Sequence, residues 1–281
     1  MKLRLRPGAD VDEAAQRLTA LGWNTYNAIP AGTPATKVRD QYVLWATRTE
    51  QELHSFLRPE DAAALFSNPQ HRDVCSMPAG TQLLALVNAE VNAKADTFRE
   101  LADQLKATRD RMRRAPGVPV LPDSNILLHC QRPDSIAWKP VLGDNARLLL
   151  PLRVIEELDM KKYSDSGRLA RAARDLLPWI EAHFPQGDKG PVAIRDTATL
   201  EILLAERPRY RPDDADEEIL DVAHEVQHMT GARVVFLTND TGARLRGISE
   251  SLEVLRPPRA WLRQMPERPG PPSDEAVPGC S

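Results

Sequence analysis

Four acidic residues in the second half of the chain have the types and positions of ligands for a divalent metal ion. Asp123 follows the apolar run 118–122, and Asp240 follows the apolar run 233–237. Glu157 lies just past a third apolar run, and Asp216 opens an amphipathic stretch. If these runs are parallel strands, strand ends and helix starts meet at one edge of the sheet, where open α/β sheets bind ligands.

Carboxylates gathered at one edge repel one another, so a close cluster either takes up protons or binds cations. Oxygen ligands with no cysteine or clustered histidine select Mg²⁺ or Mn²⁺. Such an ion can activate a water molecule and stabilise negative charge on a phosphodiester. The predicted chemistry is therefore metal-dependent phosphodiester hydrolysis.

Each acid also has a purely structural explanation. Asp123 can cap the helical turn that follows it, and Asp216 can complement the dipole of its own helix. Asp240 fits a turn, and Glu157 fits a solvated helix face. For each acid taken alone, the structural explanation is favoured over metal binding. The occurrence of all four acids at the same topological place favours the metal site.

Strands and helices alternate between residues 118 and 257. This order predicts a parallel sheet with right-handed crossovers. The stretch 199–206 fits a strand or a helix. We expect the remaining strands over residues 118–122, 147–154, 192–194, 233–237 and 252–255, and helices over residues 135–142, 166–184 and 213–230, with one more carrying Glu156 and Glu157.

Residues 1–115 predict a mainly helical α+β module. Residues 81–114 contain no Pro or Gly and keep an apolar stripe at helical spacing, which predicts a helix of about 30 residues. Short strands are expected over 1–8 and 41–47. Residues 115–117, Ala-Pro-Gly, end the long helix and mark the domain boundary. The long helix either packs against its own module or forms the seam of a homodimer.

The composition fits a protein without a membrane partner. Hydrophobic residues make up 42% of the chain, and no apolar run approaches the roughly 20 residues that span a bilayer. Three widely separated cysteines and an N-terminus without an apolar core favour a cytoplasmic location. The net charge of −3 gives no global support for nucleic-acid binding. Residues 258–281 are rich in Pro and Gly, and we expect an extended or disordered tail.

Five segments resemble the PIN-domain nucleases in their order and spacing. They are LPDSNILL at 121–128, LPLRVIEELD at 150–159, GRLARAAR at 167–174, DEEILDVA at 216–223 and VVFLTND at 234–240. The resemblance covers residues 118–257. It implies a three-layer α/β/α fold around a parallel sheet, and metal-dependent cleavage of phosphodiester bonds, usually in RNA.

The resemblance also implies roles for individual residues. The catalytic and metal-binding acids fall on Asp123, Glu157, Asp216 and Asp240, with Glu156 as the alternative to Glu157. The supporting positions fall on Asn125, Thr238 and Asp221, although Asp221 fits a surface role equally well. Pro122 and Pro119 depart from the pattern, because proline removes a donor from a central strand. A short strand, or an altered pose of the first acid, is the expected consequence.

Basic residues lie close to the predicted acids. They are Lys161, Lys162, Arg168, Arg171 and Arg174. They are either a solvated helix face or a cationic rim that holds a nucleic-acid backbone. Aromatic residues are only 5% of the chain and do not interleave with the basic ones. We therefore expect recognition of single-stranded RNA with little reading of sequence.

Three functions remain open at this point. The leading one is an Mg²⁺- or Mn²⁺-dependent endoribonuclease with an appended helical module. The second is a catalytically inactive PIN-fold scaffold that binds RNA or protein, and the third is a metal-dependent phosphatase. Cleavage of RNA, or of a small phosphoester with RNA left intact, separates the enzymes from each other and from the scaffold.

Overall fold

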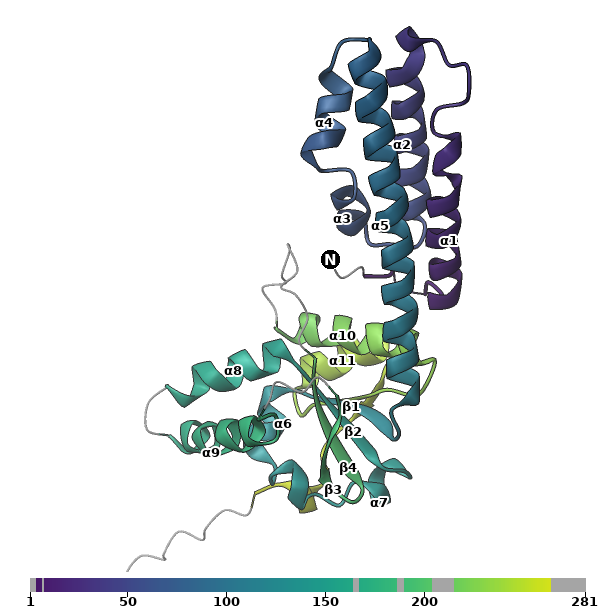
Figure 1. Ribbon diagram of the computed structural model, residues 1–281. Coiled ribbons are helices and arrows are strands. Elements are labelled where there is room, and N and C mark those ends of the chain that lie inside the picture. Colours follow the sequence, from purple (N-terminus) through teal and green to yellow (C-terminus); the bar gives the residue numbers. More distant parts are fainter. Residues whose placement is uncertain (1–3, 7, 164–166, 186–189, 204–214, 264–281) are drawn as a thin grey trace, which may run out of the picture.

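The computed structural model describes residues 4–6, 8–163, 167–185, 190–203 and 215–263. The described residues form two hydrophobic cores, one within an N-terminal helical part and one around a β-sheet. The helical part stands over one side of the α/β part, and a single long helix, α5 (Thr81–Arg114), belongs to the first and reaches the second (Figure 1).

The helical part is built around α5, whose expected length is confirmed at 34 residues. Residues 41–47, expected as a strand, lie instead inside a helix, because the buried side chains of that helix recur every three or four residues from Val38 to Leu53. Leu5 forms only an isolated bridge with Leu57. The other elements are α1 (Val11–Asn24), η1 (Thr25–Asn27), η2 (Ala35–Lys37), α2 (Val38–His54), α3 (Pro59–Ala64) and α4 (Pro69–Ser76).

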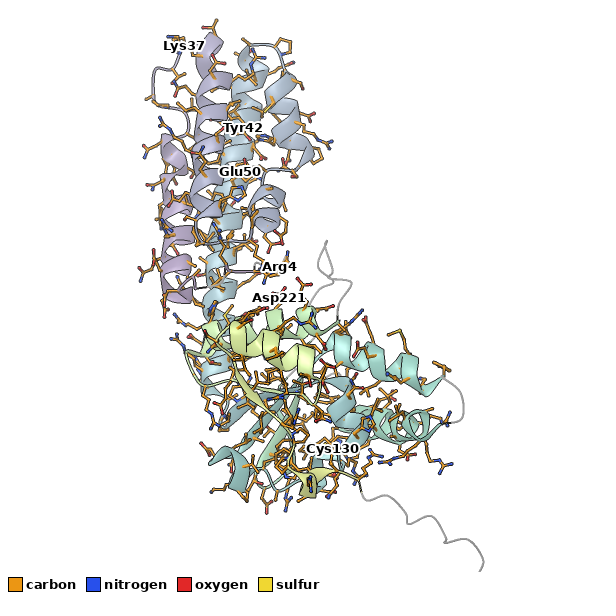
Figure 2. The ribbon with its side chains drawn as sticks, turned by 180° about the vertical axis from the view of Figure 1, so that it is seen from behind. Arg4, Lys37, Tyr42, Glu50, Cys130 and Asp221 are labelled. Carbon is orange, nitrogen blue, oxygen red and sulfur yellow. The ribbon has the colours of Figure 1, made fainter. Side chains whose placement is uncertain are left out.

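A buried charge pair and its partners crosslink these helices. The ammonium of Lys94 lies 3.2 Å from the carboxylate of Glu90, and both side chains are almost fully buried. Asn68 donates to Glu90 at 3.0 Å and caps α4 through its Oδ1, which accepts from the backbone N–H of His71. His71 in turn contacts the hydroxyl of Tyr42 at 2.7 Å, in the upper half of the helical part (Figure 2).

The α/β part contains a six-stranded sheet in the order β3-β4-β2-β1-β5-β6. All neighbouring strands run parallel except β3 and β4. The expected fold class is therefore confirmed, and the stretch 199–206 that fitted two structures forms a strand up to its last described residue, Leu203. The strands are β1 (Val118–Pro122), β2 (Ala146–Pro151), β3 (Val192–Arg195), β4 (Ala198–Leu203), β5 (Val235–Leu237) and β6 (Glu253–Leu255).

Helices surround this sheet (Figure 1). The chain leaves β1 toward β2 and later returns to β5 on the other side of β1, so the strand order reverses between β1 and β5. None of the described helices has both the length and the apolar character needed to cross a membrane. The helices are α6 (Ser124–His129), η3 (Pro133–Ser135), α7 (Lys139–Leu142), α8 (Leu152–Lys162), α9 (Arg168–Ala182), α10 (Ala215–Thr230), α11 (Thr241–Ser249) and η4 (Arg259–Trp261).

The prediction of an extended or disordered tail from residue 258 is wrong for its first residues. Residues 259–261 form η4, and Trp261 is buried with its ring centroid 4.8 Å from that of Trp138. The Trp–Trp contact buries a large apolar area, which outweighs the preference of the Pro-rich segment for solvent. The rest of the predicted tail, residues 264–281, lies outside the described residues.

Strand β1 accommodates its two prolines without being interrupted. Pairing with β2 covers only Val118–Val120, and pairing with β5 covers only Val120–Pro122. Because backbone groups alternate sides along a strand, the nitrogen of Pro119 faces β5 before that pairing begins. The nitrogen of Pro122 faces β2 after that pairing has ended. Each missing N–H therefore falls where the ladder needs no donor.

Helix α10 is the main contact between the two parts. Arg58 of the helical part forms a bidentate ion pair with Asp221 of α10, with N···O distances of 2.6 and 2.9 Å. Arg113 at the end of α5 donates to the carbonyl of Met229, and Met229 packs into the helical core. Figure 2 shows Asp221 at this junction, facing the helical part.

A second link is a charge pair inside the sheet. Arg147 of β2 and Glu201 of β4 are both about 99% buried or more, and Nη2 of Arg147 lies 2.5 Å from Oε2 of Glu201. Arg147 also donates to the carbonyl of Met112, and Arg111 contacts Glu201. The C-terminal turn of α5 is thus bound to the middle of the sheet by buried charges.

Removing one charge of the Arg147–Glu201 pair should destabilise the fold, whereas replacing both charges with apolar side chains should cost little stability. Glu201→Leu leaves the buried guanidinium of Arg147 without its counter-charge, so we expect a loss of about 3–5 kcal/mol in the free energy of unfolding. Arg147→Met combined with Glu201→Leu should recover most of that loss. Urea unfolding followed by tryptophan fluorescence measures both. Arg147→Met alone completes the comparison. A double variant that loses as much stability as Glu201→Leu and Arg147→Met added together would contradict the coupling.

Candidate metal-dependent active site

A pocket of about 290 Å³ lies at the carboxyl end of β1. It is lined by Asp123, Ser124, Asn125, Glu157, Met160, Lys161 and Asp216. These residues come from the end of β1, from α6, from α8 and from the start of α10. The pocket therefore brings together three of the four acids that the sequence predicted, next to the position where the strand order reverses.

Asp123 is the best-fixed of these acids. Its side chain is 97% buried. As the N-cap of α6 it accepts a hydrogen bond from the backbone N–H of Ile126 at 2.6 Å, and the hydroxyl of Thr238 donates to its other oxygen at 2.5 Å. The capping explanation of this carboxylate is therefore confirmed, and the same residue also lines the pocket.

The pKa of Asp123 is raised to about 6, chiefly by burial. The hydrogen bonds from Thr238 and Ile126 lower this pKa, and the charges of Asp216 and Glu157 contribute smaller increases. The two other acids therefore act on Asp123 as neighbouring negative charges. Three carboxylates around one pocket, one of them buried, are an arrangement that a cation stabilises.

Two arginines balance the other acids of the pocket. Glu157 on α8 lies 3.9 Å from Arg153, one turn earlier, and the same guanidinium lies 4.0 Å from Glu218 of α10. Asp216 lies 3.1 Å from Arg246 of α11. Neither arginine was predicted from the sequence, although the spacing of Arg153 and Glu157 by four residues on one helix indicates the first pair.

Asp240 does not line the pocket. It is exposed, and its Oδ1 accepts from the backbone N–H of Ala243 as the N-cap of α11. It is nevertheless connected to Asp123, because its own backbone N–H donates to the hydroxyl of Thr238, which donates to Asp123. Thr238 thus joins the ends of β1 and β5.

Of the remaining residues that were predicted to support the site, one lines the pocket and two do not. Asn125 lines the pocket and is exposed. Glu156 is half-buried and is not among the pocket-lining residues, in contrast to Glu157. Asp221 is engaged by Arg58 at the junction with the helical part, so its carboxylate is held there and not at the pocket.

Among the basic candidates, Lys161 lines the pocket itself. Lys162 instead lies 2.5 Å from Asp159 and over the ring of Tyr163. Arg168, Arg171 and Arg174 are exposed on α9, and Arg174 donates to the carbonyl of Lys162. The structure also exposes the side chains of Met160 and Tyr163 at this end of α8, by 61% and 77%, which the sequence analysis did not single out.

The oxygen ligands that the pocket offers are of the kind that a hard divalent cation binds. Asp123, Glu157 and Asp216 offer carboxylate oxygens only, which are the ligands of Mg²⁺ and Mn²⁺. In the part of the chain that the structure describes, no three His, Cys, Asp or Glu side chains are already close enough to hold a metal ion. The acids therefore face one pocket but are spread around it, with Glu157 and Asp216 directed toward their arginines.

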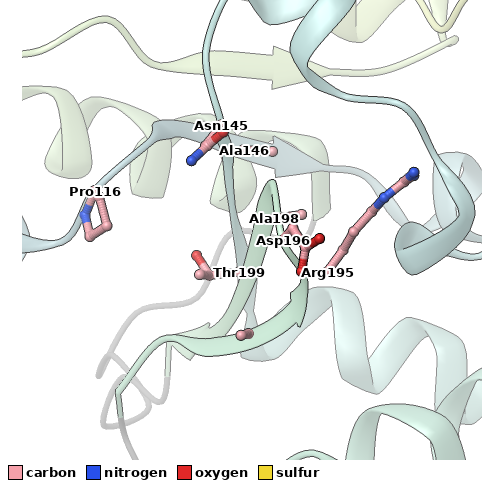
Figure 3. A pocket seen from close by; sticks show the side chains of 8 residues that line it. Pro116, Asn145, Ala146, Arg195, Asp196, Ala198 and Thr199 are labelled. Carbon is pink, nitrogen blue, oxygen red and sulfur yellow. The ribbon is translucent and has the colours of Figure 1, made fainter.

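A second hollow lies at the opposite edge of the sheet, at the start of β2 and β4 (Figure 3). It is lined by Pro116, Asn145, Ala146, Ala193, Arg195, Asp196, Ala198 and Thr199. Arg195 extends away from the other lining side chains and donates to the carbonyl of Ile136. Only one acid lines it, so it lacks the converging carboxylates of the first pocket.

Comparison with known proteins agrees with this geometry. The α/β part has a nuclease-like architecture with acids at the switch point of a parallel sheet. A family model described as PIN domain matches residues 120–256, just under half of the 281-residue chain. This match supports the assignment of residues 120–256 to the PIN-domain family, whose members are generally nucleases and typically use divalent metals. No curated protein matches the chain.

Replacing Asp123 with Asn should stabilise the metal-free protein at pH 7.5. The folded state raises the pKa of Asp123 from 3.8 to about 6, so the folded protein binds this proton more tightly than the unfolded chain. The carboxylate therefore destabilises the fold above pH 6, by about 3 kcal/mol at most, and this cost disappears as the pH falls below about 4. Asn keeps an acceptor for Ile126 and a donor for Thr238.

Urea unfolding in EDTA at pH 7.5 and pH 4 measures this difference. Glu217→Gln is the matched control, because it removes one charge from an exposed neighbour of Asp216. We expect Asp123→Asn to gain stability at pH 7.5 only, and Glu217→Gln to change little at either pH. An equal gain for Asp123→Asn at both pH values would show that its charge is not the cause.

Proposed function

We propose that the PIN domain of this chain is an Mg²⁺- or Mn²⁺-dependent endoribonuclease that acts on single-stranded RNA. The observation that carries the proposal is the buried carboxylate of Asp123, whose pKa is raised by burial and by the charges of Asp216 and Glu157 across one pocket. A cluster of carboxylates that contains a buried member is costly without a counter-ion, and such clusters concentrate at functional sites.

In this proposal Asp123, Glu157 and Asp216 hold the metal ion. The ion supplies Lewis-acid stabilisation of the charge that develops on the phosphoryl group during hydrolysis. Asp240 lies outside the pocket lining and contributes through the Thr238 hydroxyl, which fixes the orientation of Asp123. Helix α6 contributes rigidity, because its first turn begins at Asp123 itself.

Other groups at the pocket suit the backbone of a nucleic acid. Lys161 lies in the pocket wall, where its ammonium offsets the charge of a phosphate that approaches the acids. Asn125 is exposed beside Asp123 and offers hydrogen bonds to a sugar or phosphate. The scissile bond is then the P–O bond that a water molecule breaks by forming a new bond to phosphorus.

The preference for a single strand is supported by the surface at the end of α8. Tyr163 is 77% exposed and Met160 is 61% exposed, and Met160 lines the pocket. An exposed aromatic ring at the end of the helix that also carries Lys161 is a stacking surface for an unpaired base. The choice of RNA over DNA comes from the family resemblance, and a cytoplasmic location is proposed with it.

A second function is favoured by one observation. Because Glu157 and Asp216 each have an arginine nearby, their charges are partly balanced without a metal ion. The domain would then be a PIN-fold scaffold that binds RNA without cutting it. Cleavage and metal binding must therefore be measured separately from RNA binding.

Variants of the acids should separate these functions. We expect wild type to linearise a circular single-stranded RNA in the presence of Mn²⁺, and Asp123→Asn and Asp216→Asn to lose activity by more than about 100-fold. Loss of an outer partner alone costs about 10- to 100-fold, so loss of a ligand should cost more. Glu217→Gln on the same helix turn should retain activity. A circular substrate has no ends, so its cleavage shows an endonuclease.

Calorimetric titration with Mn²⁺ provides a readout that does not depend on activity. Wild type and Glu217→Gln should bind the ion, and Asp123→Asn should bind it much more weakly. Equal cleavage by wild type and both active-site variants would refute the metal site. RNA binding without cleavage or Mn²⁺ binding would establish the scaffold instead.

A further inference from the structure

The hollow at the start of β2 and β4 has the size and lining of a small-molecule site. Its volume is about 430 Å³. Small-molecule sites have volumes of roughly 300–1,000 Å³, mostly apolar walls and a few polar groups. The apolar part of this lining consists of Pro116 and three alanines, Ala146, Ala193 and Ala198. Because these side chains are small, they leave the space open for a flat ring.

Three polar side chains that line this hollow have no partner among the described residues. The hydroxyl oxygen of Thr199 is buried and makes no hydrogen bond there. Within the same described residues, the side-chain amide of Asn145 makes no hydrogen bond, and the exposed carboxylate of Asp196 makes neither a hydrogen bond nor an ion pair. Figure 3 shows the three side chains around the hollow. A buried polar group without a partner is rare in a folded protein, and a ligand supplies the missing partner.

The backbone that carries these side chains is fixed by hydrogen bonds between separate segments. The carbonyl of Asn145 accepts from the N–H of Val118 at 2.8 Å, and the N–H of Ala146 donates to the carbonyl of Thr197 at 2.9 Å. Gly117 has a φ of +94°, and a Cβ there would lie 2.8 Å from the carbonyl oxygen of Asn145, so this position requires glycine. The segments before β1, β2 and β4 are therefore tied together. A site built on a fixed backbone loses little entropy when it binds a ligand.

The charges around the hollow disfavour an anion as its occupant. Asp196 is the acid among the described lining residues. The guanidinium of Arg195 extends away from the other lining side chains and donates to the carbonyl of Ile136 at 2.8 Å. A phosphate or carboxylate inside the hollow would therefore meet a negative charge without a facing cation. The occupant must instead bring N–H donors to a carboxylate and an apolar face to Pro116, and a nitrogen heterocycle does both.

We propose that this hollow binds a guanine base. Guanine carries its N1–H and its 2-amino group side by side, so the two donors match the two oxygens of one carboxylate, as a guanidinium does. Its O6 and N7 are acceptors. In this arrangement Asp196 accepts from the donor pair, and Asn145 and Thr199 donate to the acceptors. Adenine lacks the donor pair, because the ring nitrogen next to its amino group is an acceptor that a carboxylate repels.

Two sources supply the same base, a free guanine nucleotide and an unpaired guanosine of an RNA strand. In both, the ribose and phosphate lie outside the hollow, away from Asp196. The site goes beyond the proposed function, because it lies at the edge of the sheet opposite to the acidic pocket and needs no metal ion. Pro116 belongs to the connection between α5 and β1, so the bound base also contacts the link between the helical part and the sheet.

Calorimetric titration of the full chain tests this site, with GMP, IMP and AMP as the probes. EDTA is present, so that no divalent ion binds the phosphate at the acidic pocket. IMP is GMP without the 2-amino group and should bind about 10-fold more weakly than GMP, because it loses a hydrogen bond to a charged group. AMP should bind more weakly still. Equal affinity for the three nucleotides, or a Kd for GMP above about 1 mM, overturns the proposal.

A variant of the carboxylate tests the donor pair. Asp196→Asn should weaken GMP binding by about 10- to 100-fold and remove most of the difference between GMP and IMP. Asp144→Asn is the matched control, because Asp144 is exposed in a neighbouring turn and does not line the hollow, and asparagine keeps the acceptor for the N–H of Asn145. It should change neither affinity nor selectivity. Equal losses in the two variants would show that the base is not read by Asp196.

Thr199→Val separates binding from folding, because the two should not change in the same direction. Valine has nearly the shape of threonine but no hydroxyl, so it removes a buried group that has no partner in the free protein. The free variant should therefore unfold at the same or a higher urea concentration, whereas GMP binding should weaken by about 5- to 10-fold. A less stable variant, or one that binds GMP as tightly as wild type, contradicts the role of Thr199.

Competition experiments distinguish the two sources of the base. In the Asp123→Asn background and in EDTA, we would displace a fluorescent GMP with a single-stranded RNA of ten adenosines or with the same strand carrying one central guanosine. Displacement by the guanosine strand alone identifies RNA as a source, and displacement by neither strand identifies the free nucleotide. Equal displacement by both strands overturns the proposal. If GMP does not bind but wild type cleaves RNA with Mn²⁺, this inference fails and the proposed function stands.

Discussion

The hydrogen bond from Thr238 to Asp123 joins the two strands between which the order of the sheet reverses. It connects the ends of β1 and β5, the donor and the acceptor are both buried, and the carboxylate also caps α6. A buried carboxylate is tolerated only because both oxygens receive hydrogen bonds. The position of the first acid is therefore set by the same contacts that set the packing of β1, β5 and α6.

Much of this arrangement could be predicted from the sequence because it depends on local patterns. The apolar runs and the acids that follow them specify strand ends, and a parallel sheet places strand ends at one edge. Asp123, Glu157 and Asp216 were brought to one pocket by that rule. Asp240 was not, because its N-capping bond to Ala243 turns the carboxylate to the start of α11. A capping preference and a site preference compete for the same side chain, and the sequence does not rank them.

The features that the sequence did not reveal depend on contacts between distant segments. Arg147 and Glu201 lie in runs that read as apolar strands, yet both are buried and paired to each other and to the end of α5. Residues 41–47 have the β-branched and aromatic composition of a strand, but packing against α5 selects a helix instead. Tertiary contacts override local propensity here, because the buried residues recur at the helical period although the composition favours a strand.

Helix α10 connects the chemistry to the helical part of the chain. Its first turn carries Asp216 at the pocket, its middle carries Asp221 in the ion pair with Arg58, and its end carries Met229 in the helical core. A helix is stiff over this length, so a displacement of its far end is transmitted to its first turn. The helical part is therefore in mechanical contact with one acid of the site, whereas Asp123 is held by Thr238 at the end of β5 and by the first turn of α6. The two acids are positioned by different parts of the molecule, and their separation depends on how those parts pack.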